Sequence, residues 1–100
     1  MKNKKNQLSS VVNAAKKRGL TVKLVDTRRL KDYAGMNDLI AKKMGFKCPP
    51  KTIMADKHMS IPKQRQTLRH EIIERGHMAN GMPYWKAHKI ALKRENKRLI

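Results

Sequence analysis

Residues 60–76 have the sequence SIPKQRQTLRHEIIERG, and we expect this segment to form the helix that organises the fold and carries its chemistry. Ser60 is a favourable N-cap residue, because its hydroxyl can accept a hydrogen bond from a free backbone N–H of the first turn. Pro62 falls in that first turn, where the N–H that proline lacks is not needed. Gly76 is the expected end of the helix, since glycine commonly follows the last helical residue.

Two chemically different faces are expected on this helix. The core-facing stripe consists of Ile61, Leu68 and Ile72. The opposite face carries His70 and Glu74, one turn apart, with Glu71 beside them. Ligands at positions i and i+4 can bind one cation, and a carboxylate at i+1 can act on a water, as in the His-Glu-x-x-His zinc helix. Here a glutamate occupies the place of the second histidine.

The segment after this helix supplies a third ligand to the predicted site. A second helix is expected over residues 83–97, with His88 facing inward toward the first helix. His88 would then join His70 and Glu74 around one divalent ion, and zinc suits such a set of imidazole and carboxylate ligands. His77 is a reserve ligand if the second helix crosses too far away. The alternative is an ordinary ion pair between His70 and Glu74 with no metal.

The rest of the chain predicts a small α+β domain. The further elements are helices at residues 8–18 and 36–44 and strands at residues 20–25 and 52–56. The two strands should form a small antiparallel sheet beside the two C-terminal helices, with the second strand at its edge. Residues 1–7 are expected to be a flexible basic tail, and residues 8–100 a single domain.

The net charge of the sequence is +18, from 25 Lys and Arg against 7 Asp and Glu. A field of this sign attracts polyanions, and nucleic acid is the commonest polyanion in a cell. The last helix should present a basic stripe suited to phosphates, formed by Lys86, Lys89, Lys93 and Lys97. An ordinary solvated face explains the same stripe equally well. No zinc-finger, basic-zipper or RNP motif is present, so any nucleic-acid binding should show little sequence preference.

Targeting signals are not apparent in the sequence. No apolar run approaches the roughly 20 residues that span a bilayer, and none follows the basic N-terminus as in a signal peptide. The single cysteine, Cys48, cannot form an internal disulfide, and nothing else points to an oxidising compartment. We therefore expect a cytoplasmic protein with no membrane partner, in the host cell if the protein is viral.

Residues 52–74 include the strand sequence TIMAD and the helix sequence TLRHEIIE, and they resemble small zincin-like metallopeptidases. The resemblance is greatest to the ImmA/IrrE group and to minimal single-domain gluzincins. Those proteins have a short edge strand, a loop, and a helix whose Thr-Leu-x-His-Glu sequence enters the metal site. The resemblance covers roughly residues 50–92, and the earlier part of the chain agrees only in outline.

This resemblance implies a zincin-like fold and a metallopeptidase site. His70 would be the first metal ligand and Glu71 the general base. Glu74 stands where the family has its second histidine, and His88 stands where a third ligand is supplied. The strand at residues 52–56 would align an extended peptide by β-augmentation.

Three functions remain open from the sequence. The first is a metal-dependent hydrolase that acts on a peptide or protein substrate through a metal-activated water. The second is a non-catalytic, basic nucleic-acid-binding protein, for example an accessory factor of a virus or mobile element. The third is an interaction protein that binds a larger assembly. Bound metal and salt-dependent affinity for nucleic acid distinguish the first two.

Overall fold

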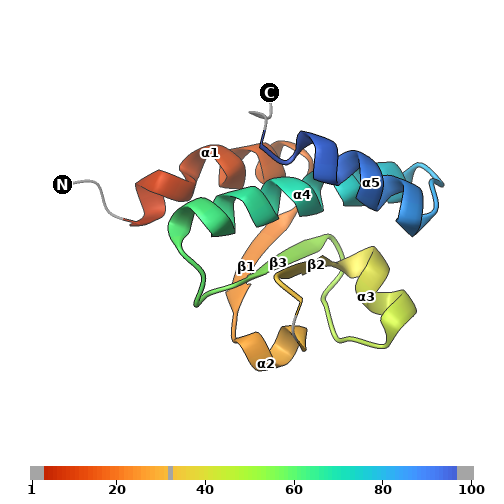
Figure 1. The fold of residues 1–100 in the computed structure, drawn as a ribbon, viewed down its shortest axis with the longest axis horizontal. Helices are drawn as coiled ribbons and strands as arrows, with labels where there is room; N and C mark the ends of the chain where they lie inside the picture. Colours follow the sequence, from red (N-terminus) through yellow and green to blue (C-terminus); the bar gives the residue numbers. More distant parts are fainter. Residues whose placement is uncertain (1–3, 32, 97–100) are drawn as a thin grey trace.

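A three-stranded sheet lies between two layers of helices in the computed structural model, which describes residues 4–31 and 33–96 (Figure 1). The longer helices lie on one side of the sheet, and the shorter ones lie on the other side. The elements are α1 (Lys4–Lys17), β1 (Thr21–Val25), α2 (Thr27–Leu30), β2 (Gly35–Asn37), α3 (Asp38–Met44), β3 (Thr52–Asp56), α4 (Ile61–Ala79) and α5 (Tyr84–Arg94). The predicted α+β layout is confirmed.

The sheet is mixed, with strand order β1-β3-β2. β1 pairs with β3 in parallel, so the expected antiparallel pairing of these two strands was wrong. β3 is also central rather than at the edge, and all five of its residues are buried. The reason is the long connection between β1 and β3, which returns the chain to its starting end, as parallel pairing requires. The same connection contains β2, which pairs antiparallel with β3 and forms the second edge.

Helix boundaries differ from the prediction at several ends. α1 begins at Lys4 and so includes residues 4–7, which the sequence assigned to a flexible tail; residues 1–3 lie outside the described part. α4 continues past Gly76 to Ala79, because Gly76 keeps a helical conformation and the helix ends at Asn80 instead. α5 ends at Arg94, whereas the prediction continued to residue 97.

The hydrophobic core has two parts, and α4 contributes to both of them. On the side of α1, Leu68 and Ile72 of α4 pack against Val11, Ala15 and Ile53, as predicted. Ile61, the third residue of the predicted core-facing stripe, is only partly buried. The second part lies toward α2, α3 and α5. Its larger members are Val25, Leu30, Met36, Ile40, Met54 and Met78. α4 is therefore held against the sheet along its length, which fixes the direction in which its polar face points.

Close packing of β2 against α4 depends on Gly35. A Cβ atom at this position would collide with the Thr67 side chain and lie 2.8 Å from the backbone oxygen of Met54. Because the glycine has no side chain, the edge strand can approach the middle of α4, near Glu71. Among the described helices, none is long and apolar enough to cross a lipid bilayer.

Candidate metal centre

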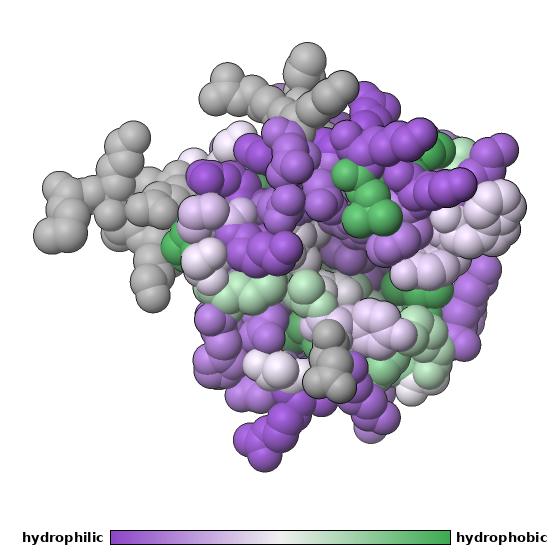
Figure 2. Space-filling model, viewed as in Figure 1, coloured by the Kyte–Doolittle hydropathy of each residue, from purple (hydrophilic) through white to green (hydrophobic). Residues whose placement is uncertain are grey.

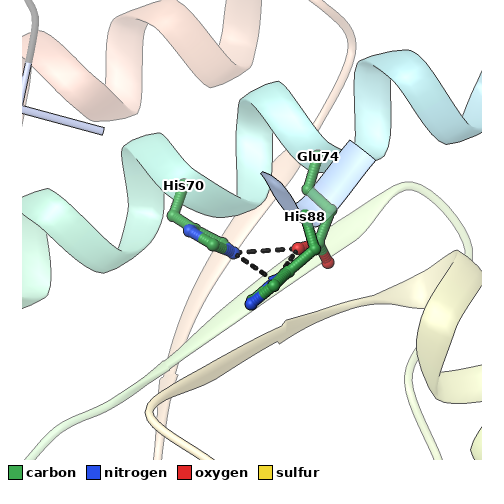
Figure 3. A group of neighbouring side chains, drawn as sticks. All are labelled: His70, Glu74 and His88. Carbon is green, nitrogen blue, oxygen red and sulfur yellow. Dashed lines mark hydrogen bonds and ion pairs between the residues drawn. The ribbon is translucent and has the colours of Figure 1, made fainter. Parts of the chain in front are cut away.

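Three side chains from α4 and α5 point at one another (Figure 3). Nε2 of His70 lies 2.8 Å from Oε2 of Glu74, and the same oxygen lies 2.8 Å from Nδ1 of His88. The two ring nitrogens are 3.1 Å apart. The three residues predicted as metal ligands therefore converge, with one donor atom each, on a single point.

The two helices hold these donors in place by ordinary packing. His70 and Glu74 are one turn apart on α4, and both are buried. α5 packs along α4 and brings His88 over the pair. The Tyr84 ring, one turn earlier on α5, stacks on the imidazole of His88 with centroids 5.3 Å apart. A tight turn joins the helices, in which Gly81 has a φ of 96° that favours glycine.

The donor set fits a metal ion in both chemistry and spacing. Two imidazole nitrogens and one carboxylate oxygen form a triangle with sides of 2.8, 2.8 and 3.1 Å. A tetrahedral zinc ion with bonds of about 2.0–2.1 Å holds its ligand atoms about 3.3–3.4 Å apart. A small outward movement of side chains thus suffices for binding. His70, Glu74 and His88 could hold a metal ion.

The carboxylate of Glu95 contacts the ring nitrogen of His70 that does not face Glu74. Nδ1 of His70 lies 2.8 Å from Oε2 of Glu95, the residue that follows α5. When Nδ1 carries the proton and donates it to Glu95, Nε2 is left with its lone pair directed at the centre of the triangle. Such a carboxylate–histidine pair fixes the ring and makes it a better ligand. With Glu95, all three glutamates of the sequence meet at this site.

Asn37 links the site to the edge of the sheet. Its Nδ2 donates to Oε1 of Glu71 at 3.1 Å and to Oε1 of Glu74 at 3.2 Å. Its Oδ1 accepts from the first free backbone N–H groups of α3 and so caps that helix. The side chain is fully buried. Asn37 therefore holds Glu71 and Glu74 side by side from the end of β2.

Burial and crowding of charge raise two pKa values in the site. Burial, followed by the charge of Glu74, raises the pKa of Glu71 to about 8. Burial works against a charged His70, but the hydrogen bond to Glu74 and the charge of Glu71 outweigh it and raise the pKa of His70 to about 9. Near neutral pH, these raised pKa values favour protons on His70 and Glu71, which offset the negative charge of the buried carboxylates. A cation bound among them would replace that positive charge.

A cavity of about 220 Å³ opens beside these groups. The predicted residues His70, Glu71, Glu74 and His88 all line it. The edge strand contributes Gly35 and Met36 to its wall. Glu71 therefore lies beside the same space as the three candidate ligands, as the prediction required of a general base.

Other residues singled out from the sequence lie elsewhere. His77 lines a separate hollow with Ile73 and Asn80, so the reserve ligand is not part of the group. The basic stripe of α5 is exposed at Lys86, Lys89 and Lys93, whereas Lys97 lies outside the described residues.

Two supporting residues, Glu95 and Asn37, were missed by sequence reasoning. Glu95 could have been identified from its spacing, since it follows His88 by seven residues, or about two helical turns, and so falls on the same face of the helix. The sequence around Asn37 indicates only a helix N-cap, because its contacts with Glu71 and Glu74 depend on how the chain folds.

No protein-family model, curated protein or solved structure matches the chain. The resemblance to zincin-like metallopeptidases therefore stays a prediction. The geometry itself supports a coarser statement, which is that His70, Glu74 and His88 could hold a metal ion.

Proposed function

We propose that this protein is a metal-dependent hydrolase of peptide bonds, with zinc held by His70, Glu74 and His88. The observation that carries the proposal is the convergence of three donor atoms at the wall of an open cavity. No two of these atoms are more than 3.1 Å apart. A purely structural ion pair would need only His70 and Glu74. The presence of His88 and of the supporting Glu95 favours a ligand set.

Zinc suits this set better than magnesium or calcium, which prefer oxygen ligands. With three protein ligands, a bound zinc would have room for a water or substrate from the cavity, which is typical of catalytic rather than structural zinc. When bound there, zinc would polarise a substrate carbonyl and lower the pKa of a water molecule to about 7.

Glu71 is the proposed general base. It is buried beside the proposed ligands and lines the same cavity, where its carboxylate could reach a water molecule at the metal. The hydrogen bond from Asn37 fixes one carboxylate oxygen. The carboxylate can accept the proton from the attacking water and then deliver it to the amine that leaves.

The edge strand for an extended peptide is β2 rather than the residues 52–56 expected from the sequence. The backbone oxygen of Ala34 accepts a hydrogen bond from the N–H of Asp56. Gly35 and Ala55 are the next pair of opposite residues in this antiparallel ladder. Bonded and non-bonded pairs alternate in such a ladder, so the N–H and C=O of Gly35 face the free edge. Gly35 also lines the cavity, which supports alignment of a peptide beside the ligands.

The metal content of the purified protein tests this proposal. Protein made without a histidine tag is expected to contain one zinc ion per chain by elemental analysis. It should hydrolyse an unstructured polypeptide, lose that activity with a chelator, and regain it with zinc. Protein with less than about a tenth of an equivalent of any transition metal, and no affinity for added zinc, would contradict the proposal.

A second candidate function, nucleic-acid binding, is favoured by the surface of α5. Lys86, Lys89 and Lys93 are exposed on this helix, and Trp85 beside them is 65% exposed. Figure 2 shows hydrophilic side chains gathered over the region of α1, α4 and α5. An exposed aromatic ring among lysines is suited to stacking on an unpaired base next to phosphates.

We expect single-stranded DNA or RNA to bind with little sequence preference and to quench the fluorescence of Trp85, which is the single tryptophan of the sequence. Reversing the charge of Lys86, Lys89 and Lys93 should weaken binding and reduce the slope of log affinity against log salt by about 2. The control reverses Lys42, Lys43 and Lys47, which changes the net charge equally. Equal losses in both variants, or no binding at low salt, would contradict a site on α5.

A further inference from the structure

Exposed hydrophobic side chains gather around the candidate site. Among the described residues, the large hydrophobic side chains that are exposed are Leu24, Tyr33, Met44, Trp85 and Leu92. Three of them line the cavity beside the candidate ligands: Tyr33 is 45% exposed, Met44 40% and Leu92 51%. Exposed apolar groups that cluster around one cavity indicate a binding surface, whereas single ones do not.

These three side chains reach the cavity from separate parts of the chain. Tyr33 precedes β2, Met44 is the last residue of α3, and Leu92 lies on α5. Leu92 follows His88 by one helical turn, so its side chain lies on the same face as the candidate ligand. Ile40, which is buried and lies one turn before Met44 on α3, also lines the cavity. The apolar wall is thus continuous with the candidate metal centre.

The polar side chains that line the cavity come mainly from α4 and the end of α5, and several of them are already paired. Nζ of Lys63 donates to Oε1 of Gln66 at 3.1 Å, and Nε2 of Gln66 donates to Oδ1 of Asn96 at 2.8 Å. Glu95 is engaged with His70. These bonds engage part of the polar lining, whereas binding of an apolar side chain against Tyr33, Met44 and Leu92 only has to displace water.

The size of the cavity limits what it can accept. Its 220 Å³ is smaller than the pockets of about 300–1,000 Å³ that enclose drug-sized ligands. One large side chain and the adjoining backbone fit such a space, whereas a several-residue segment does not.

We propose that the site selects peptide substrates with a large aliphatic or aromatic residue next to the bond that is cleaved, held by Tyr33, Met44 and Leu92. This inference rests on the proposed function, because it assumes a metal-bound scissile carbonyl beside the apolar wall. The remainder of the substrate follows the edge strand and contributes little to the selection.

Three hydroxamates that differ only in their tails test this proposal on the zinc-loaded protein by calorimetry. Acetohydroxamate binds an open zinc ion without a tail, 4-methylpentanohydroxamate adds an isobutyl group, and succinic monohydroxamate adds a carboxylate. We expect the isobutyl compound to bind at least about tenfold more tightly than either of the others, because its tail is buried. Leu92→Ser should reduce that preference to below about threefold.

The matched control is Leu24→Ser, which removes an exposed leucine outside this cavity and should leave the preference unchanged. Equal affinity for all three compounds, or tightest binding of the carboxylate, would overturn the apolar selection while leaving the metal-centred function intact. Failure of every hydroxamate to bind would overturn the proposed function and this inference with it.

Discussion

Glu71→Gln is expected to remove hydrolytic activity and to leave the metal in place. The amide cannot accept the proton of the attacking water, so kcat/KM should fall by about 100- to 10,000-fold. Glutamine keeps the shape of the side chain and an oxygen that can accept from Asn37. Burial raises the pKa of Glu71 and so already favours the neutral form of this side chain in the wild type. The folded structure should therefore tolerate the change.

The measurement pairs turnover of a peptide substrate with zinc content and thermal unfolding of the same sample. Zinc content within error of wild type and an unchanged or slightly higher Tm are the controls that separate a lost base from a damaged site. Retained activity at more than a tenth of wild type would show that another group takes the proton, and Glu71 would lose its proposed role.

His70→Ala is expected to abolish tight metal binding. The substitution deletes one of the three proposed ligands and leaves Glu74 and Glu95 without their shared partner. Loss of a residue that only supports a ligand typically costs 10–100-fold in affinity, so loss of a ligand itself should exceed about 100-fold. Competition with a chromogenic chelator measures the zinc affinity directly.

Two further variants serve as comparisons for the zinc affinity of His70→Ala. His77→Ala removes another histidine of α4 that lies outside the group, and it should bind zinc as wild type does. Glu95→Gln keeps an acceptor for Nδ1 of His70 but removes its charge, so its affinity should fall between the other two variants. If His70→Ala fails to fold, His88→Ala tests the same centre from the more exposed ligand. Wild-type affinity in both ligand variants would disprove the site.

The long, strongly periodic segments could be predicted from the sequence, but strand pairing could not. Leu68 and Ile72 are one turn apart on α4, and apolar residues at this spacing predict the side of a helix that faces the core. The direction of β1 relative to β3 depends on how residues 26–51 cross the sheet, and no local pattern encodes that path. β2, at three residues, is too short to show any alternation.

The ligands of the candidate site could be predicted for a similar reason. His70 and Glu74 have the one-turn spacing of a metal-binding pair, and His88 falls on the inward face of the next helix. Asn37 and Glu95 act from the ends of other elements, where their contacts depend on the exact position of the neighbouring backbone. The pKa changes also depend on the assembled fold, since burial raises the pKa of Glu71 and the hydrogen bond to Glu74 and the charge of Glu71 raise that of His70 against the effect of burial.

The central position of β3 has a consequence for the order in which the molecule can be assembled during synthesis. Thr21 pairs with Thr52 and Gly35 with Ala55, so neither outer strand has a partner until the third strand has left the ribosome. Contacts this distant in sequence slow folding, because a long loop must close before they form. The helix with His70 and Glu74 follows at once, and α5 last. In a nascent chain, the candidate metal centre is thus incomplete until α5 has docked.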